Sequence, residues 1–360
     1  MRIAQIAPLY ESVPPKLYGG TERVVSYLTE ELVRQGHEVT LFASEDSRTH
    51  AHLNPLHMPA LRLSAAGASD VAAHYRLLED VMRHGDEFEA MHFHVDFLHF
   101  PFTRRAYPKH LTTLHGRLDM PGLTELYEEY WDQPVVSISA SQKAPLPHAL
   151  WIGTVYHGLP LDLYRPGPGK GGYLAFLGRI APEKGPEEAI AIAKAAGIPL
   201  KIAAKVDPVD QDYFEARVKP LLDSNLVQFI GEVDEAGKQD LLGDALALVF
   251  PIDWPEPFGL VMIEAMACGT PVVAYRRGSV PEIIDEGLTG FIVEDRAGAV
   301  DVLSRVGGLD RAAIRQRFEA RFGVERMVRD YLDIYRVVAR FEDDAPHRAV
   351  DAARRHASAP

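Results

Sequence analysis

The chain has 360 residues, 47% hydrophobic and 25% charged, which is the composition of a globular protein longer than one core usually supports. Its 38 Lys and Arg residues against 51 Asp and Glu residues give a net charge of −13, which argues against a nucleic acid as the main partner because a phosphate backbone needs a basic face. The single cysteine, Cys268, argues against a disulfide framework and a cysteine metal site. No apolar run approaches the ~20 residues of a membrane span, and the start of the chain predicts a strand rather than a signal peptide, so we expect a soluble, cytoplasmic protein.

The first half of the chain predicts alternating strands and helices. Residues 2–7 predict a buried strand, residues 8–20 a loop rich in Pro and Gly, and an amphipathic helix follows before the strand expected at 37–43. This order is the first β-α-β turn of a doubly wound sheet, in which ligands approach the carboxyl ends of the strands. The Gly-x-Gly-x-x-Gly dinucleotide fingerprint is absent, and on residue grounds alone Gly19 and Gly20 also fit a simple flexible turn.

Histidines stand at the ends of two of the expected strands. His92, His94 and Asp96 would share one face of a strand, as metal ligands do, but no other ligand cluster is near them in the sequence. His94 is also compatible with a hydrogen-bonded core histidine. His115 ends the strand expected at 111–116, where an imidazole can donate to a ligand and stabilise developing charge. A structural role is the alternative interpretation of His115.

The second half repeats the pattern after a segment with the Pro and Gly density of a linker. This segment covers residues 163–172, and the strand expected at 173–177 opens a second doubly wound sheet. The turn after that strand carries Arg179 and Lys184, and two fixed cations before a helix suit a diphosphate. An ordinary charged surface turn is the alternative. Strands and helices go on alternating, which predicts a parallel sheet with helices on both faces.

The most informative motif is the nine-residue stretch Glu-Pro-Phe-Gly-Leu-Val-Met-Ile-Glu from Glu256 to Glu264. It follows the apolar run at 246–250 and a Pro-broken loop, so it predicts a strand, a loop and a helix. Glu256 then lies in the loop and Glu264 more than one turn inside the helix, and both can address a ligand at the helix N-terminus. The free N–H groups and positive dipole end there favour an anion. A plain β-α unit with exposed glutamates is the alternative.

This motif, preceded along the chain by the turn with Arg179 and Lys184, resembles the signature of family 4 retaining glycosyltransferases. The resemblance runs over roughly residues 1–340 and is most specific from 173 to 293. It implies an α/β fold of the GT-B type, with two Rossmann-like doubly wound domains facing a cleft. The expected parts are an N-terminal acceptor-side domain (1–165), a C-terminal nucleotide-sugar donor-binding domain (166–322), a helix crossing back to the N-terminal domain (323–341) and a flexible tail (342–360).

The resemblance also implies a hexosyltransferase-type glycosyltransferase, which moves a sugar from a UDP- or GDP-sugar to a small-molecule, lipid or saccharide acceptor and keeps the anomeric configuration. No carboxylate stands out as a covalent nucleophile, so we favour a front-face reaction in which the leaving phosphate takes the proton of the acceptor. A short-lived double displacement stays open. Protein cations and the helix dipole can stabilise the developing charge, so we expect neither a metal nor a cofactor, and the nucleotide sugar is a substrate.

Residues that match the family's positions take their roles from the resemblance. The implied catalytic residues are His115 near the reacting carbon of the donor, Arg179 and Lys184 on the diphosphate, and Glu256 on the sugar hydroxyls. The implied donor-binding residues are Gly19, Gly20, Phe258, Gly259, Leu260, Val261 and Glu264, the last of them holding the ribose hydroxyls. The acceptor side is assigned Tyr18, Glu22 and His94. Where the family commonly has Asn at the end of the strand expected at 154–158, this chain has His157, to which we assign no role.

Three other functions stay open at this point. A glycoside phosphorylase or synthase on the same fold would keep the phosphate-binding residues. A non-hydrolysing nucleotide-sugar epimerase would need acid and base carboxylates in place of the Glu256 pattern. A non-catalytic nucleotide-sugar-binding protein would lack one of the four implied catalytic residues, all of which are present. The sequence also leaves open the donor base and sugar, the acceptor, the linkage, the oligomeric state and any peripheral membrane contact.

Overall fold

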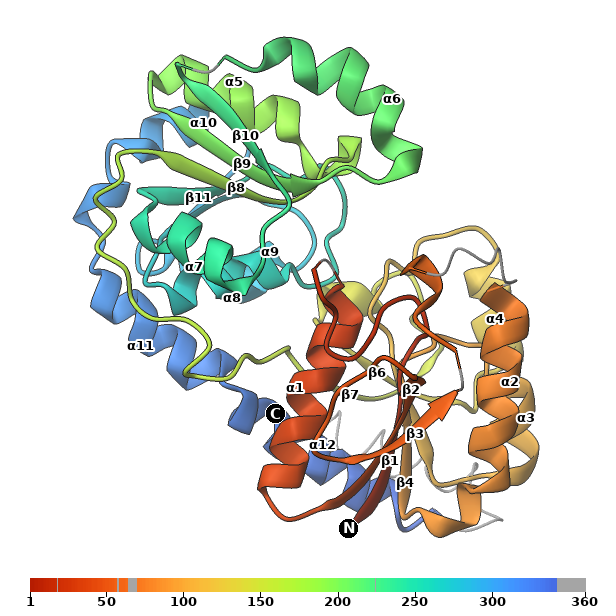
Figure 1. Cartoon of the computed structure of the whole chain (residues 1–360). Coiled ribbons are helices and arrows are strands. Elements are labelled where there is room, and N and C mark those ends of the chain that lie inside the picture. Colours follow the sequence, from red (N-terminus) through yellow and green to blue (C-terminus); the bar gives the residue numbers. More distant parts are fainter. Residues whose placement is uncertain (18, 57, 64–69, 224, 342–360) are drawn as a thin grey trace. The chain divides into compact units, whose positions relative to one another are not determined.

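The computed structural model describes residues 1–17, 19–56, 58–63, 70–223 and 225–341 (Figure 1). The chain divides into two compact units, Met1–Gly158 with Val324–Pro360, and Leu159–Gly323. The tail expected at 342–360 lies outside the described residues. No helix within the described ranges is long and apolar enough to cross a membrane.

The first unit is built on a seven-stranded parallel sheet with the order β3-β2-β1-β4-β5-β6-β7. Its strands are β1 (Arg2–Ile6), β2 (Glu38–Ser44), β3 (His52–Leu56), β4 (Ala90–Phe93), β5 (His110–Thr113), β6 (Pro134–Ser137) and β7 (Leu150–Thr154). Its α-helices are α1 (Gly20–Arg34), α2 (Asp70–Arg83), α3 (Phe100–Ala106), α4 (Leu123–Glu129) and α12 (Val324–Val338). Short 3-10 turns lie at Leu61–Leu63, Gly85–Glu87 and Ser141–Lys143.

The two faces of this sheet differ in polarity. Because side chains alternate along a strand, Ala4 and Ile6 of β1 point to the face where α2 adds Leu77 and Leu78 to an apolar core. Gln5 points to the other face, where it stands opposite His92 of β4 in the register of the two strands. The last helix α12 covers that polar face, and it packs beside α1 (Figure 1).

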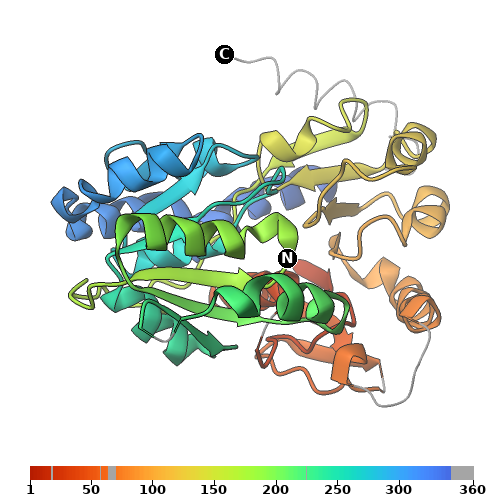
Figure 2. The same cartoon turned by 90° about the horizontal axis from the view of Figure 1, so that it is seen from above.

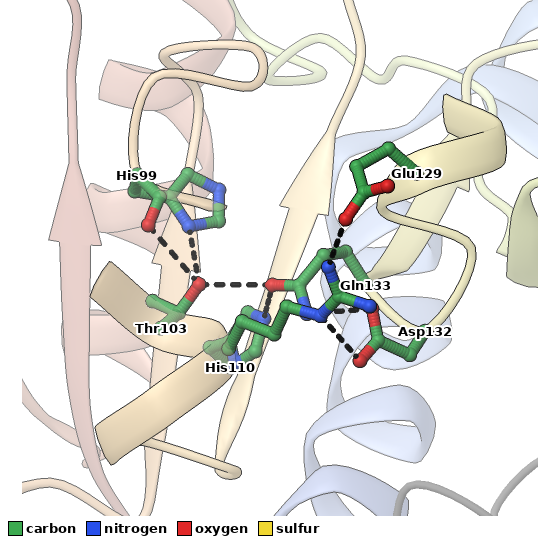
Figure 3. A network of polar contacts seen from close by, with 7 residues as sticks. His99, Thr103, His110, Glu129, Asp132 and Gln133 are labelled. Atoms are coloured by element: carbon green, nitrogen blue, oxygen red, sulfur yellow. Dashed lines mark hydrogen bonds and ion pairs between the residues drawn. The ribbon is translucent and has the colours of Figure 1, made fainter. Parts of the chain in front are cut away.

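A polar network on the apolar side of the sheet is held by Gln133 (Figure 3). The side-chain oxygen Oε1 of Gln133 accepts a hydrogen bond from Thr103 Oγ1 at 3.0 Å and lies 3.1 Å from His110 Nε2. Thr103 in turn lies 3.1 Å from Nδ1 of His99, whose ring stacks on Phe93 at 3.8 Å. His99 and His110 are therefore histidines of the core, and burial lowers the pKa of His110 to about 4.

The second unit is built on a six-stranded parallel sheet with the order β10-β9-β8-β11-β12-β13. Its strands are β8 (Leu174–Arg179), β9 (Leu200–Lys205), β10 (Val227–Gly231), β11 (Ala247–Phe250), β12 (Val272–Tyr275) and β13 (Gly290–Val293). Its α-helices are α5 (Pro186–Ala196), α6 (Gln211–Tyr213), α7 (Glu235–Asp244), α8 (Leu260–Ala267), α9 (Val280–Ile283), α10 (Arg296–Leu303) and α11 (Arg311–Phe322). Figures 1 and 2 show α5 running along the strands β8 and β9, against which it packs. Two parallel sheets with helices confirm the expected α/β architecture.

Short turns complete the second unit. A 3-10 turn at Pro182–Lys184 precedes α5, further 3-10 turns lie at Pro208–Asp210, Lys219–Leu221 and Val306–Gly308, and a π-turn covers Phe214–Val218. The segment that the sequence suggests as a linker packs onto this unit, so the unit begins at Leu159 rather than after residue 165. Arg165 N donates to Gln239 Oε1 at 2.7 Å, and Gly167 N donates to Cys268 O at 2.9 Å.

Arg311 at the start of α11 fixes this segment. Its guanidinium donates to the carbonyl oxygens of Gly167 at 3.0 Å, Gly243 at 2.9 Å, Ala245 at 3.1 Å and Cys268 at 3.3 Å. It also donates to Thr270 Oγ1 at 2.6 Å. A planar guanidinium presents five donors in a fixed geometry, so one side chain connects the linker-like segment, the end of α7 and the end of α8.

Candidate functional site

The loop that carries Glu256 is held in place by backbone contacts that leave no space for other side chains. The backbone of Gly278 approaches so closely that a Cβ there would lie 2.3 Å from the N and O atoms of Glu256. Ser279 N donates to Glu256 O at 2.9 Å, and Ser279 Oγ donates to Phe258 O at 2.9 Å. Gly259, immediately before α8, adopts a left-handed conformation with φ 78°, which favours glycine. The loop is therefore preorganised.

Lys184, Trp254 and Glu256 form a cluster beside this loop. Lys184 Nζ lies 2.6 Å from Glu256 Oε2 and 4.4 Å from the centroid of the Trp254 ring. Trp254 Nε1 donates to the same oxygen, Glu256 Oε2, at 2.9 Å. The side chain of Glu256 is only 10% exposed and that of Lys184 18% exposed, so the pair is largely shielded from water. The structure thus brings together two of the four residues predicted to be catalytic. Trp254 was not singled out in the sequence, although a Trp in a Pro-bounded loop two residues before Glu256 was a usable signal.

Arg179 was expected to share one anion with Lys184, and the structure gives it other neighbours. Arg179 ends β8, and its guanidinium lies 2.8 Å from Glu183, 3.6 Å from Asp207 and 3.9 Å from Asp210. These carboxylates already balance its charge, and they would compete with a phosphate for it. The role of Arg179 on a diphosphate stays a prediction.

The remaining predicted donor residues lie on or next to α8. Leu260 and Val261 form its first turn, whose N–H groups have no partner within the helix by geometry. Phe258 is fully buried, with its ring 6.3 Å from that of Phe322. Glu264 is 3% exposed, and its Oε1 accepts from Lys238 Nζ of α7 at 2.8 Å. Periodicity gave no sign of Lys238, because a contact between two helices leaves no local pattern.

In the first unit, the predicted residues of the β1–α1 loop have packing contacts of their own. A Cβ on Gly19 would lie 2.7 Å from Cβ of Pro15, so this position has no room for a side chain. Gly20 begins α1, and Glu22 is buried in its first turn. Glu22 Oε1 accepts from Glu11 N at 3.3 Å, and burial raises the pKa of Glu22. Tyr18 lies outside the described residues.

His94 and His115 are in direct contact. His94 Nδ1 lies 2.9 Å from His115 Nε2, and His94 Nε2 lies 2.9 Å from Gln5 Oε1. The ring of His157 stacks on that of His115 with centroids 5.3 Å apart. Desolvation lowers the pKa of His115 to about 3 and holds the pKa of His94 well below its ordinary value, so both imidazoles are neutral at pH 7. His157, which has no role by resemblance, therefore belongs to the surroundings of His115.

His92 does not act as the metal ligand considered from the sequence. Its Nδ1 lies 2.8 Å from Tyr335 Oη and its Nε2 lies 2.7 Å from Thr113 Oγ1, so both ring nitrogens are used inside the protein. Within the described ranges, no group of three or more His, Cys, Asp or Glu side chains is arranged to hold a metal ion. The expectation that the reaction needs no metal stays a prediction.

Two family models match the two halves of the chain. The model described as Glycosyltransferase Family 4 matches residues 18–150, and the model described as Glycosyl transferases group 1 matches residues 166–305. The chain belongs to the family 4 glycosyltransferases. This membership agrees with the resemblance carried by Lys184 and the Glu256–Glu264 motif.

Curated relatives of this chain include two D-inositol 3-phosphate glycosyltransferases. The one from Catenulispora acidiphila is 30% identical over 216 residues, which cover 51% of this chain and 50% of the relative. The one from Mycobacterium tuberculosis is 31% identical over 190 residues, which cover 47% of this chain and 39% of the relative. The chain thus spans half the length of these relatives or less.

Solved structures similar to this chain agree on its fold. AviGT4, a glycosyltransferase involved in avilamycin A biosynthesis, has a TM-score of 0.72 at 24% identity and covers 94% of this chain and 98% of its own. Sucrose-phosphate synthase from Thermosynechococcus elongatus has a TM-score of 0.75 at 21% identity, with the same coverages. HepE from Anabaena, in complex with UDP and glucose, has a TM-score of 0.72 at 17% identity and covers 94% of this chain and 100% of its own. The fold is GT-B, as expected.

Proposed function

We propose that this protein is a retaining glycosyltransferase that moves a sugar from a UDP- or GDP-sugar to a hydroxyl-bearing acceptor. The observation that carries the proposal is the shielded Lys184–Glu256 pair beside the start of α8. A cation and a helix N-terminus suit the diphosphate, and a carboxylate suits the hydroxyls of the sugar. The family membership and the UDP complex of the similar protein HepE support the same donor class.

In this proposal Lys184 serves two partners at once. An ammonium group has three donors, so Lys184 can keep its contact with Glu256 Oε2 while it donates to an oxygen of the diphosphate. Its charge then stabilises the leaving group as the negative charge grows. Trp254 and Lys184 both contact Oε2 of Glu256, which orients Oε1 as an acceptor for a sugar hydroxyl. The amides of Leu260 and Val261 complete the phosphate site.

The finer parts of the proposal follow from the same groups. We keep the front-face reaction without a metal or cofactor, because the lysine and the helix dipole supply the charge that a metal would supply elsewhere. His115 of the first unit contacts a hydroxyl of the ligand.

The acceptor is a small molecule, a lipid or a saccharide. D-inositol 3-phosphate, which the names of the relatives contain, is the first one to test. The cytoplasmic location is part of the proposal.

The test is nucleotide release from a panel of UDP- and GDP-sugars, with and without candidate acceptors. We expect Lys184→Ala and Glu256→Gln to depress transfer by roughly 2–4 kcal/mol of transition-state stabilisation, because each removes a charge at the reacting groups. Lys219→Ala is the matched control, since Lys219 forms an exposed ion pair with Glu215 at 2.7 Å. Equal activity of the Lys184 variant and the control would contradict the site.

Two product measurements separate the alternatives. Phosphorolysis of a disaccharide by the protein, without nucleotide release, would favour the phosphorylase. The anomeric configuration of the product, read by proton NMR, tests retention directly. Donor binding without any turnover over the whole acceptor panel, including water, would favour the non-catalytic binding protein.

A further inference from the structure

A buried chain of polar side chains crosses the central strands of the first unit and ends at His115. It starts at Gln5 of β1, which is fully buried. Gln5 Oε1 lies 2.9 Å from Nε2 of His94, and His94 Nδ1 lies 2.9 Å from Nε2 of His115. His94 follows β4 and His115 follows β5, so three neighbouring strands contribute one residue each.

The same Gln5 amide is anchored on its other side by α12. Gln5 Nε2 donates to Tyr335 Oη at 2.9 Å, and Tyr335 Oη lies 2.8 Å from His92 Nδ1. His92 Nε2 lies 2.7 Å from Thr113 Oγ1, which lies 2.9 Å from Tyr331 Oη. All members of the chain except the half-buried His115 are buried, so their hydrogens must be shared within the chain and not with water.

The orientation of the Gln5 amide decides where the hydrogens lie. A neutral imidazole has one N–H donor and one nitrogen acceptor. Because Gln5 Oε1 is an acceptor, the nitrogen that faces it, His94 Nε2, carries the hydrogen. Nδ1 of His94 is then the acceptor, so His115 must donate from its own Nε2. The hydrogen of His115 is thereby fixed on Nε2, and its Nδ1 keeps a lone pair.

We propose that Gln5 and His94 are positioning residues that fix His115 as the Nε2–H tautomer, so that Nδ1 of His115 accepts a hydrogen bond from a hydroxyl of the ligand. No hydrogen bond from another described residue reaches Nδ1 of His115, and the half-buried ring is held by its stacking on His157. The identity of the ligand rests on the proposed function. The tautomer itself rests only on the chain of hydrogen bonds.

The Nε2–H tautomer changes the chemistry expected of His115. A donor on Nδ1 would suit a phosphate oxygen, whereas a lone pair repels one and selects a group that carries a hydrogen. The free nitrogen of His115 therefore recognises a sugar or acceptor hydroxyl. The neutral state follows from desolvation, which lowers the pKa of His115 to about 3 and prevents the imidazole from becoming a donor on both nitrogens in the neutral pH range.

The opposite arrangement is chemically defined and measurable. If the Gln5 amide were turned over, its NH₂ would face His94, every hydrogen along the chain would reverse, and His115 would carry its hydrogen on Nδ1. Nitrogen-15 NMR of histidine side chains distinguishes the two tautomers without any turnover. The signals of His115 are assigned as those missing from the His115→Asn variant of the full chain.

Three proteins decide the inference: the unaltered chain, Gln5→Met and Tyr331→Phe. In the unaltered chain we expect His115 as the Nε2–H tautomer. Gln5→Met keeps the volume but removes the acceptor for His94, so the fixed tautomer should be lost and kcat for transfer should fall about tenfold, the cost of one hydrogen bond in the transition state. Tyr331→Phe removes a buried hydroxyl beyond Thr113, so it should leave the tautomer of His115 and kcat unchanged.

The outcomes separate this inference from the proposed function. An Nδ1–H tautomer of His115 in the unaltered chain overturns it, even if the Gln5 variant fails to fold. A folded Gln5→Met variant with the original tautomer and kcat also overturns it. The expected tautomers without any sugar transfer by the unaltered chain would leave the positioning chain standing and count against the glycosyltransferase assignment alone.

Discussion

The two units have the same kind of sheet but satisfy their buried polar groups in opposite ways. The first unit carries all 15 histidines of the chain, and the second, Leu159–Gly323, has none. In the first unit, neutral imidazoles bridge strands and helices, as His92 and His94 do. In the second, cationic side chains form such contacts, as with Arg311 on four carbonyl oxygens and Lys184 on Glu256.

This difference teaches that similar folds can depend on pH in different ways. A guanidinium keeps its charge throughout the range in which proteins are folded. A buried imidazole that must stay neutral is driven towards protonation when the medium becomes acidic. The first unit is therefore the part of the chain whose stability is tied to the state of its histidines.

Acidification should destabilise the first unit more than the second, and this is the largest effect that we expect. Burial lowers the pKa of several of its histidines, namely His92, His94, His99, His110, His115 and His157. Below about pH 6.5 the unfolded chain binds protons at these positions and the folded chain does not, so the free energy of unfolding falls as the pH falls. Each histidine contributes roughly 1 kcal/mol per pH unit.

The three tryptophans allow the pH dependence of unfolding to be measured for each unit separately. Denaturant titrations followed by fluorescence at about pH 7.5 and about pH 5.5 would use Trp254→Phe to observe the first unit, through Trp131 and Trp151. The double variant Trp131→Phe, Trp151→Phe observes the second unit through Trp254. Equal shifts of both midpoints would contradict the assignment of the acid sensitivity to the first unit.

Arg311→Ala should lower the stability of the second unit by an amount that does not depend on pH near neutrality. Its loss removes the guanidinium donor from the carbonyls of Gly167 and Ala245, whereas those of Gly243 and Cys268 keep a backbone N–H donor. We expect a destabilisation of about 3 kcal/mol, and Lys at this position should not restore the set of hydrogen bonds. The fluorescence of Trp254 measures the effect. Arg276→Ala is the control, because Arg276 pairs with Glu294 on the surface and should change stability by no more than about 0.5 kcal/mol. A matching loss in both variants would mean that the guanidinium of Arg311 has no special role.

Trp254→Phe should weaken catalysis at the candidate site, and this is the smallest effect that we expect. The change removes the N–H that donates to Glu256 Oε2 and keeps an aromatic ring near Lys184. We expect a loss of about 1 kcal/mol in transition-state stabilisation, or roughly fivefold in kcat, which is less than for Lys184→Ala because a neutral donor is lost and not a charge. Steady-state kinetics of both variants on one donor decide the order.

The sequence predicted the parts of the molecule that have a local pattern. Alternating apolar segments indicated both parallel sheets, and the spacing of Glu256 after an apolar run placed it correctly in the loop before α8. The resemblance assigned Lys184 and Glu256 to one site, and the structure brings them into contact beyond the carboxyl ends of the neighbouring strands β8 and β11. Periodicity and strand order carry this information, because side chains repeat with the element and parallel strands end at one edge.

The parts that the sequence did not reveal depend on contacts between distant residues. Gln5 is one polar residue in an apolar strand, and its partner Tyr335 lies at the other end of the chain. His92 and His94 alternate as metal ligands do, and only their partners show that they belong to a hydrogen-bonded chain. Arg179 appeared equivalent to Lys184, but two of its three carboxylate neighbours, Asp207 and Asp210, come from the segment after β9, which no motif marked.

Cys268 can serve as a probe of local opening because of its position at the end of α8. The thiol is fully buried, burial raises its pKa to about 12, and Arg311 and Gly167 both bind the carbonyl of the same residue. Thiol reagents attack the thiolate, so this sulfur stays unreactive while the surrounding contacts hold. Because the chain has no other cysteine, the rate of alkylation reports how often this corner of the molecule opens, with no engineered label.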